Sequence, residues 1–326
     1  MATQLLSARV HLMRHEADGV VGIELRPVDP VAEFPPVEAG AHVDVHLPNG
    51  IVRSYSLSNM PGETHRYVLG VLLDRASRGG SRFVHEQLRV GSVIGLSGPR
   101  NHFQLNELAE MSVLVAGGIG ITPLLSMLRR LSALGQKVHM IYCARSRLQA
   151  GFMEDVRSLT DVTGALTLHF DDEQRGPPDL KALMTPFVGP STHFYACGPS
   201  PMLAAYESTL AELGQGNVHL ERFTAIPSAA LDPGLNDTNE YQVELHRSRR
   251  IVTVKAGQTL LDAMLDAGIP VNYSCCEGVC GTCETPVLSG EVEHRDGLLS
   301  DSEKAANRTM MVCVSRPMAT GLVLDI

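Results

Sequence analysis

Four cysteines near the end of the 326-residue chain restrict its fold more than any other feature. Cys275, Cys280 and Cys283 follow the spacing C-x4-C-x2-C, and Cys313 stands thirty positions after the third of them. A 2Fe-2S cluster needs four thiolates, and one short loop can supply three of them at this spacing. A zinc site or buried structural cysteines are the alternatives, but zinc ligands usually come as two close pairs. The sequence therefore predicts a 2Fe-2S site with these four cysteines as metal ligands.

The composition indicates a multidomain protein without membrane spans. The length exceeds that of one ordinary domain, 44% of the residues are hydrophobic, and no apolar run reaches the roughly eighteen residues of a membrane helix. Seven cysteines, four of them assigned to a cluster, favour a reducing compartment over a disulfide scaffold. The N-terminus shows no signal-peptide core, so we expect a cytoplasmic protein.

The charge distribution argues against nucleic-acid binding. The chain has a net charge of −9, and residues 236–326, with 13 acidic and 8 basic residues, contribute −5 of it. Nucleic-acid phosphates need a basic face, whereas an acidic surface can steer a basic protein partner. A merely solvated acidic surface is the other interpretation. We expect that the protein binds neither nucleic acid nor a membrane. We also expect it to be a monomer.

Residues 1–103 predict a small antiparallel β-barrel, because short alternating segments are separated by turns such as Pro48-Asn49-Gly50. In one segment Arg53 and Tyr55 are two residues apart, so their side chains share a face. Further on, Gly79-Gly80 precede a helical pattern, and a helix start behind glycines exposes amide groups suited to phosphate. Taken alone, each of these signals is also ordinary strand or turn sequence.

Residues 104–226 alternate apolar strands with amphipathic helices, the pattern of an α/β parallel sheet. A buried strand at 112–116 runs into a glycine-rich turn at 117–123, which is followed by apolar residues at helical spacing. Strand, glycine turn and helix predict a crevice for a nucleotide, although the spacing is not G-x-G-x-x-G. Further strands are expected at 138–143 and 192–196, with carboxyl ends at the same crevice.

Two segments that follow these strands are further candidates. Arg145 and Ser146 stand where folds of this kind read an adenosine ribose, and Cys197-Gly198-Pro199 ends the later strand. Residues 227–239 have the composition of a linker. Residues 240–326 then predict a third domain of strands, one helix and the cluster loop.

At this point the order of motifs resembles the phthalate dioxygenase reductase family, over essentially the whole chain. The resemblance implies an FMN-binding β-barrel, an NAD-binding α/β domain and a C-terminal α+β ferredoxin domain of the β-grasp type. The residues that carry it are Arg53, Ser54, Tyr55, Ser56, Gly79, Gly80 and Ser81 for FMN, and Gly117, Gly118, Ile119, Gly120, Ile121, Thr122, Pro123, Cys197, Gly198 and Pro199 for the pyridine nucleotide.

The resemblance also implies individual roles. Tyr55 would flank the isoalloxazine, and Arg53, Gly80 and Ser81 would hold the FMN phosphate. Thr122 and Cys197 would border the nicotinamide. Glu221 and Phe223 would lie beside the flavin where the nicotinamide must enter, so Cys197, Glu221 and Phe223 are the catalytic candidates.

Two departures from the family pattern stand out. Cys276 occupies the position after the first ligand cysteine, where the family commonly has Glu, and this leaves a spare thiol beside the cluster. The segment Leu72-Leu73-Asp74 lacks a basic residue often found near the flavin.

The chemistry of the implied cofactors requires their order. Nicotinamide delivers two electrons as hydride and an iron-sulfur cluster takes one at a time, so a flavin must stand between them. We therefore predict a reductase that passes electrons from NADH through FMN to a 2Fe-2S cluster, and the family resemblance implies that the acceptor is a Rieske-type oxygenase. A stand-alone NAD(P)H-dependent flavin or ferric reductase and a redox sensor are the alternatives. Arg145 and Arg147 could instead bind the 2′-phosphate of NADPH.

Overall fold

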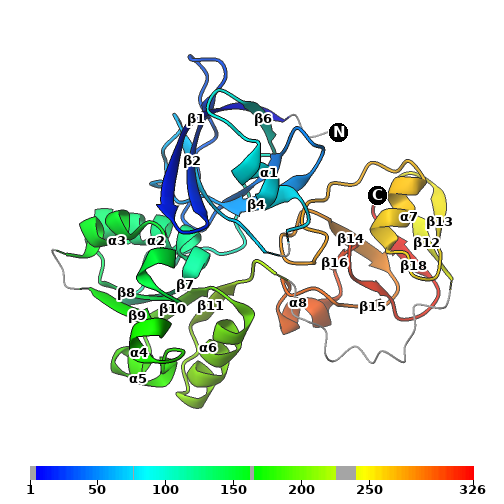
Figure 1. Ribbon diagram of the computed structural model, residues 1–326. Helices are drawn as coiled ribbons and strands as arrows, with labels where there is room; N and C mark the ends of the chain where they lie inside the picture. Colours follow the sequence, from blue (N-terminus) through cyan, green and yellow to red (C-terminus); the bar gives the residue numbers. More distant parts are fainter. Residues whose placement is uncertain (1–4, 76, 162–164, 225–239) are drawn as a thin grey trace. The chain divides into compact units, whose positions relative to one another are not determined.

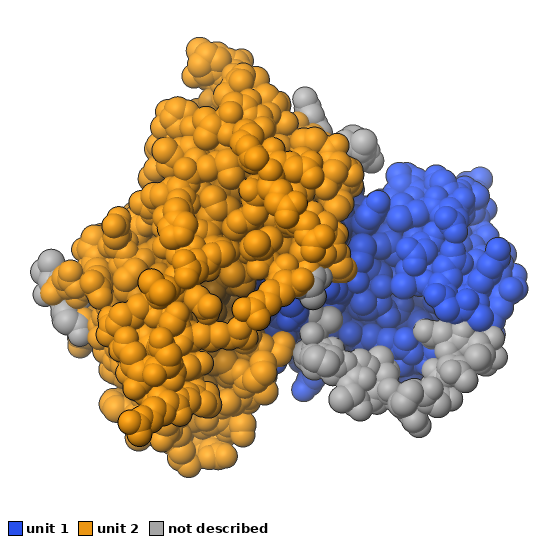
Figure 2. All heavy atoms as spheres, in the orientation of Figure 1, with its two compact units in different colours: residues 1–2, 222–326 blue, residues 3–221 orange. Residues whose placement is uncertain are grey.

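The computed structural model describes residues 5–75, 77–161, 165–224 and 240–326 (Figure 1). The chain divides into two compact units between Glu221 and Arg222 (Figure 2). The unit that ends at Glu221 is drawn in orange and keyed as unit 2, and it is called the first unit here because it comes first in the chain. The blue unit, which begins at Arg222, is called the second unit. The first unit contains the sheets of both the expected barrel and the expected nucleotide domain. The linker predicted at 227–239 lies outside the described residues, and the domain boundaries stay a prediction. In the described ranges, no helix is long and apolar enough to cross a membrane.

The barrel sheet of the first unit has six antiparallel strands in the order β4-β3-β6-β1-β2-β5. The elements are β1 (Leu6–Ala17), β2 (Val20–Pro27), β3 (His42–His46), β4 (Val52–Ser56), β5 (Tyr67–Leu72), α1 (Gly80–Glu86) and β6 (Val93–Leu96). A bridge between Leu57 and Leu69 links the end of β4 to β5, so the two outer strands of the sheet meet. Alternate side chains fill its core, among them Leu25, Val43 and Tyr67.

The nucleotide sheet of the first unit has five parallel strands in the order β11-β10-β7-β8-β9. Its strands are β7 (Met111–Gly117), β8 (Val138–Ala144), β9 (Leu166–Phe170), β10 (Thr192–Cys197) and β11 (Val218–Glu221). Its helices are η1 (Gly118–Gly120), α2 (Ile121–Ala133), η2 (Arg147–Gln149), α3 (Met153–Thr160), α4 (Asp171–Gln174), α5 (Leu180–Met184), η3 (Thr185–Phe187) and α6 (Ser200–Glu212).

Helices cover both faces of this sheet (Figure 1). Successive side chains of a strand point to opposite faces. Leu114 and Ala116 accordingly belong to a core shared with α2 and α3, and Val113 and Val115 to a core shared with α5 and α6. Because both faces are buried at its centre, the central strand β7 is apolar almost throughout, as buried parallel strands usually are.

The second unit is an α+β domain with a mixed sheet in the order β13-β12-β18-β14-β16, in which only the pair β12 and β18 is parallel. Its elements are β12 (Tyr241–Leu245), β13 (Arg250–Val254), α7 (Leu260–Asp266), β14 (Glu284–Ser289), β15 (Val292–Glu293), α8 (Asp301–Ala306), β16 (Thr309–Met311), β17 (Arg316–Pro317) and β18 (Leu322–Leu324). Thr259 and Asp262 form a capping box that starts α7. Leu260, Leu261 and Met264 bury the inner face of that helix.

The predicted fold class is confirmed: an antiparallel barrel sheet, a parallel sheet with helices, and an α+β domain that carries the cysteines. The strands β9 and β11 were not predicted. Every residue of β9 before Phe170 and all four residues of β11 are only partly buried, and both strands therefore tolerate polar side chains. Their sequences, LTLHF and VHLE, lack the continuous apolar run that marks β7.

Candidate functional site

The glycine-rich turn lies at the carboxyl end of β7, as the sequence predicts. Gly118 has a φ of 53°, in the left-handed region that favours glycine. A Cβ on Gly120 would lie 2.1 Å from the carbonyl oxygen of Cys197, and one on Gly117 would lie 2.7 Å from Pro199 Cδ. The glycines are therefore required because two predicted segments, 117–120 and 197–199, pack backbone to backbone.

Helix α2 begins directly after this turn and contacts the barrel. Thr122 is buried, and its hydroxyl donates to the carbonyl oxygen of Ile119 at 3.0 Å. Pro123 lies in the first turn of α2, where no intrahelical N–H bond is lost. A Cβ on Gly70 in β5 would lie 2.6 Å from Thr122 Cγ2 and 2.6 Å from Phe152 Cε2. The glycine inside the apolar segment YVLGVL is a signal of this close approach that the sequence reasoning missed.

Cys197 and Glu221 end the neighbouring parallel strands β10 and β11 and lie opposite each other in register. Ser56, at the end of β4 in the barrel, donates its hydroxyl proton to Glu221 Oε2 over 3.3 Å. These three predicted residues thus meet although 165 positions separate Ser56 from Glu221. Phe223 belongs to the second unit, and its side chain is exposed.

Both acidic groups at this meeting point are held in the neutral form. Burial raises the pKa of Glu221 to about 8, against a smaller lowering by the Ser56 hydroxyl. Glu221 keeps part of its surface exposed, although protein surrounds the carboxyl group densely. Burial, and then the neighbouring Glu221, raises the pKa of the Cys197 thiol well above its ordinary value. At neutral pH the site therefore presents a thiol and a carboxylic acid.

The predicted flavin motif gathers around the start of α1. A Cβ on Gly80 would lie 2.7 Å from Arg53 Cγ, so the Arg53 side chain lies directly over the helix start. Arg53 Nη2 also donates to the carbonyl oxygen of Arg78 at 3.1 Å. Gly79 has a φ of 90°, and the Ser77 hydroxyl accepts from the N–H groups of Gly79 at 3.2 Å and of Arg82 at 3.3 Å. A guanidinium beside the amide groups of a helix start is an arrangement that fits a phosphate.

Ser81 lies in the first turn of this helix, and Tyr55 follows Arg53 by two residues on β4. The Ser81 hydroxyl accepts from the backbone N–H of Asp74 at 3.2 Å and contacts Ser77 Oγ at 3.0 Å. Burial raises the pKa of Tyr55 to about 12, so its phenol stays protonated and can donate a hydrogen bond.

Arg145 and Ser146 follow β8, beside the end of β9. Arg145 is exposed, and its carbonyl oxygen accepts from the N–H of Asp172 at 3.1 Å. Arg147 donates to both carboxylate oxygens of Glu173, at 2.5 and 2.9 Å, and its guanidinium lies 4.6 Å from the centroid of Phe170. The structure thus pairs Arg147, one of the two arginines suited to a 2′-phosphate, with an acid.

The four predicted ligand cysteines of the second unit are all buried, with exposed fractions between 4% and 9%. They form two hydrogen-bonded pairs, Cys275 with Cys280 and Cys283 with Cys313. In each pair the hydrogen bond lowers the pKa of one thiol and raises that of its partner. Across the described ranges, no three His, Cys, Asp or Glu side chains form a site for a metal ion. A 2Fe-2S cluster, however, takes two ligands on each of its two irons, which suits two pairs.

Backbone amides surround these sulfurs. The N–H of Glu277 donates to Cys275 Sγ at 3.3 Å, and that of Gly278 faces the Cys313 sulfur. Thr282 Oγ1 lies 3.1 Å from Cys280 Sγ. Donors directed at several sulfurs stabilise thiolate charge, as a cluster requires. Cys276, in contrast, is exposed and has a φ of 55°.

Comparison with known proteins finds two family models that match parts of the chain. Residues 243–318 match the model of the 2Fe-2S iron-sulfur cluster binding domain, and residues 114–208 match that of the oxidoreductase NAD-binding domain. The chain is 45% identical over 322 residues to the phenoxybenzoate dioxygenase subunit beta of Ectopseudomonas oleovorans, covering 98% of this chain and 97% of that one.

Two further proteins are similar over nearly the whole length. The tetrachlorobenzoquinone reductase of Sphingobium chlorophenolicum is 46% identical over 311 residues, which cover 95% of this chain and 94% of that one. The second protein is a phthalate dioxygenase reductase, whose solved structure is called a modular structure for electron transfer from pyridine nucleotides to 2Fe-2S. Its sequence is 34% identical to this chain, and the two structures superpose with a TM-score of 0.72. The match covers 99% of this chain and 98% of the other.

Proposed function

Because the chain belongs to the phthalate dioxygenase reductase family, we propose that it is the reductase component of a Rieske-type oxygenase system. Electrons enter from NADH, pass through FMN to a 2Fe-2S cluster and leave to the oxygenase. The observation that carries this proposal is the meeting of Ser56, Cys197 and Glu221, where the predicted flavin strand reaches the nucleotide sheet. FMN, when bound, accepts a hydride and releases single electrons.

The residues of the barrel bind and orient FMN in this proposal. Arg53, Ser81 and the amides behind Gly79 and Gly80 hold the phosphate, since a cation lies over the helix start there. Tyr55, two residues from Arg53 on the same strand, flanks the ring system. Ser56 ends that strand at the nucleotide sheet.

The residues of the nucleotide sheet bind NADH. Gly117, Gly118 and Gly120 let the pyrophosphate approach the backbone at the start of α2, where the helix dipole favours its charge. Arg145 and Ser146 read the adenosine ribose at the end of β8. Thr122, Cys197 and Glu221 border the nicotinamide, with Gly198 and Pro199 shaping the wall beside them.

The neutral state of Cys197 and Glu221 suits this position. Protonated, the two side chains are hydrogen-bond donors, and they place no negative charge beside the reduced cofactors.

In the second unit, Cys275, Cys280, Cys283 and Cys313 are the proposed cluster ligands. All seven cysteines of the chain lie in described positions, and none forms a disulfide. Thiolate ligands need a reducing compartment, and on that ground we place the protein in the cytoplasm. We further propose that it acts as a monomer with an oxygenase as its protein partner.

Electron delivery from such a cluster to a Rieske centre is downhill. Plant-type clusters lie near about −400 mV and Rieske centres at about −150 to +300 mV. The smallest of these gaps, about 250 mV, favours one-electron transfer by roughly four powers of ten at about 59 mV for each power.

A second candidate function is direct reduction of a small acceptor such as a quinone. It is favoured by the relative named tetrachlorobenzoquinone reductase. The match to that relative covers 95% of this chain and therefore reaches into the 2Fe-2S domain, so the two functions have to be distinguished by their acceptors.

The test is stopped-flow reoxidation of the NADH-reduced protein, carrying FMN and its cluster, by a purified Rieske oxygenase and separately by benzoquinone. Fast cluster reoxidation by the oxygenase, with a rate that falls as salt screens the acidic second unit, supports the proposal. Fast transfer to benzoquinone with none to any Rieske protein supports the second candidate. Heat-released flavin that runs as FAD on chromatography contradicts the FMN assignment.

A further inference from the structure

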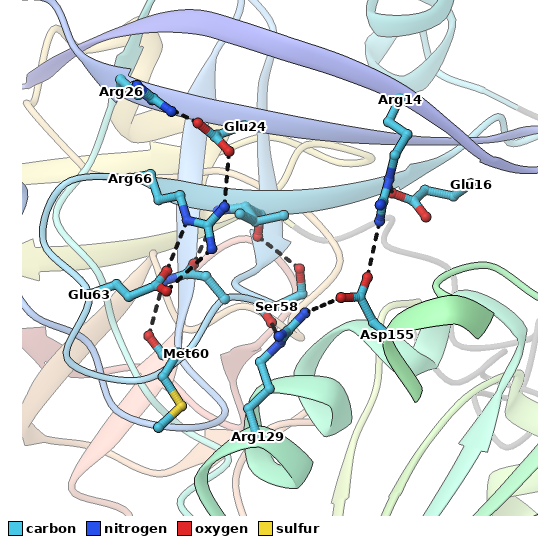
Figure 3. Close-up of polar contacts among 12 residues, drawn as sticks. Arg14, Glu16, Glu24, Arg26, Ser58, Met60, Glu63, Arg66, Arg129 and Asp155 are labelled. Atoms are coloured by element: carbon cyan, nitrogen blue, oxygen red, sulfur yellow. Dashed lines mark hydrogen bonds and ion pairs between the residues drawn. The ribbon is translucent and has the colours of Figure 1, made fainter. Parts of the chain in front are cut away.

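We propose that Arg129 and Asp155 are positioning residues for hydride transfer, which hold the nucleotide-binding helix α2 in a fixed orientation against the barrel. The inference rests on the proposed function, because it concerns how nicotinamide and flavin are brought into register. Neither residue belongs to a sequence motif of either cofactor. Both lie in the network of polar contacts drawn in Figure 3.

Arg129 joins α2 to the end of the predicted flavin strand. Its Nε donates to the carbonyl oxygen of Ser58 at 3.1 Å. Ser58 stands two residues after Ser56 and is itself anchored, because its N–H donates to the carbonyl oxygen of Val68 in β5 at 2.9 Å. The guanidinium of Arg129 thus contacts the backbone two residues after the strand that carries Tyr55 and Ser56 (Figure 3).

Asp155 in α3 ties the same arginine to a second barrel strand. Its Oδ1 accepts from Arg129 Nη2 at 2.6 Å, and its Oδ2 accepts from Arg14 Nη2 in β1 at 3.0 Å. The carboxylate of Asp155 therefore bridges Arg129 of helix α2 and Arg14 of the barrel (Figure 3). The side chains of Arg129 and Asp155 are only 26% and 25% exposed, so salt screens their pairing less than that of a surface pair.

This bridge is a polar contact between α2 and the barrel, added to the apolar contacts that the helix makes with it. Near the start of the helix Thr122 packs on Gly70, where no side chain fits between helix and strand, and farther along Met127 packs against Gly40. Arg129 follows Thr122 by seven residues, so these two contacts are about 10 Å apart along the helix axis. Apolar packing is non-directional, whereas the hydrogen bonds of Arg129 have a preferred geometry and therefore limit the rotation of the helix.

The direction of α2 matters because the predicted phosphate loop leads directly into its first turn, and that turn contains Thr122. Hydride transfer needs reacting atoms at about 3 to 3.5 Å, and a misplacement of 1 Å can cost about 100-fold in rate. Loss of the Arg129 contact leaves the glycine turn and its amides intact. We therefore expect a loss in the limiting rate of flavin reduction, with nucleotide affinity maintained.

The experiment compares Arg129→Met with Arg130→Met in the FMN-loaded full-length protein. Arg130 is the neighbouring residue of the same helix, and its donors bind Glu107 at 2.7 and 2.8 Å without touching the flavin strand. Stopped-flow flavin reduction at varied NADH concentration should show a limiting rate that is lower by about tenfold or more for Arg129→Met. The half-saturating NADH concentration should stay within about twofold, and Arg130→Met should behave as the unchanged protein.

Two further variants separate positioning from stability. Asp155→Asn keeps the size of the side chain and removes the charge, and Arg129→Lys keeps a charge but loses the two-pronged geometry. Both should give intermediate limiting rates at unchanged flavin content, together with a weaker charge-transfer absorbance on mixing with NADH.

Equal limiting rates for Arg129→Met and Arg130→Met would overturn the inference, as would a change confined to the half-saturating concentration. A rate loss that only follows flavin content or thermal stability across all four variants would assign Arg129 a purely structural role and would also overturn it. If NADH does not reduce the flavin of the unchanged protein, the proposed function fails instead, which is a distinct result.

Discussion

Replacement of Glu221 by Gln should change how the stability of the first unit depends on pH. Burial raises the pKa of Glu221 from its ordinary 4.5 to about 8, so between these values the folded protein holds a proton that the unfolded chain has released. The free energy of unfolding must then fall as the pH rises through this window and level off above about pH 8. The amide side chain of the Glu221→Gln variant has no titrating proton, so the stability of the variant lacks this decline.

The magnitude follows from the same two values. A difference of one in pKa corresponds to about 1.36 kcal/mol, so the full cost of the buried charge is about 5 kcal/mol. Because part of Glu221 reaches solvent, we expect roughly half of this. For a unit of about 200 residues each kcal/mol shifts the Tm by about 2 to 4 °C, which gives a difference of roughly 5 to 10 °C.

The assay is thermal unfolding of the FMN-loaded protein at several pH values from 5 to 9, followed by the fluorescence of released flavin. Glu221→Gln should gain Tm relative to the unchanged protein as the pH rises. Glu212→Gln removes an exposed carboxylate in the same unit and is the control. Parallel Tm curves for Glu221→Gln and the unchanged protein would refute the raised pKa.

Two further predictions concern the cluster and the choice of nucleotide. Cys280→Ser or Cys313→Ser should abolish cluster absorbance and leave NADH-driven flavin reduction in place. Cys276→Ser should keep its cluster. Loss of the cluster in Cys276→Ser alone would contradict the ligand assignment. Glu173→Gln should raise kcat/KM for NADPH relative to NADH by about fivefold at most, because it releases Arg147 from an exposed ion pair worth about 1 kcal/mol or less, and an unchanged ratio in steady-state kinetics would contradict this role.

Much of the local structure was accessible from residue patterns. The apolar segment that became β7, the glycine turn after it and the helix α2 lie where the sequence predicts them. The strand β9 was missed because only Phe170 in it is fully buried, so it carries no apolar run. The role of Gly70 was missed because a glycine in a strand does not reveal which side chain approaches it.

The sequence by itself determined the chemistry that the chain can support. The spacing of the four cysteines, the glycines before α2 and the alternation of strands and helices are local features, and each depends on residues close together along the chain. Such features set which groups each segment can bind, because backbone conformation and side-chain direction follow from short-range sterics.

Only the tertiary structure decided which groups meet. Ser56 and Glu221 are 165 positions apart, and Arg129 contacts Ser58 across 71 positions. The protonation of Glu221 is likewise a property of the folded site, because it arises from removal of the carboxyl group from water. These contacts depend on how the barrel and the nucleotide sheet pack, and no periodicity within either segment encodes the packing between them.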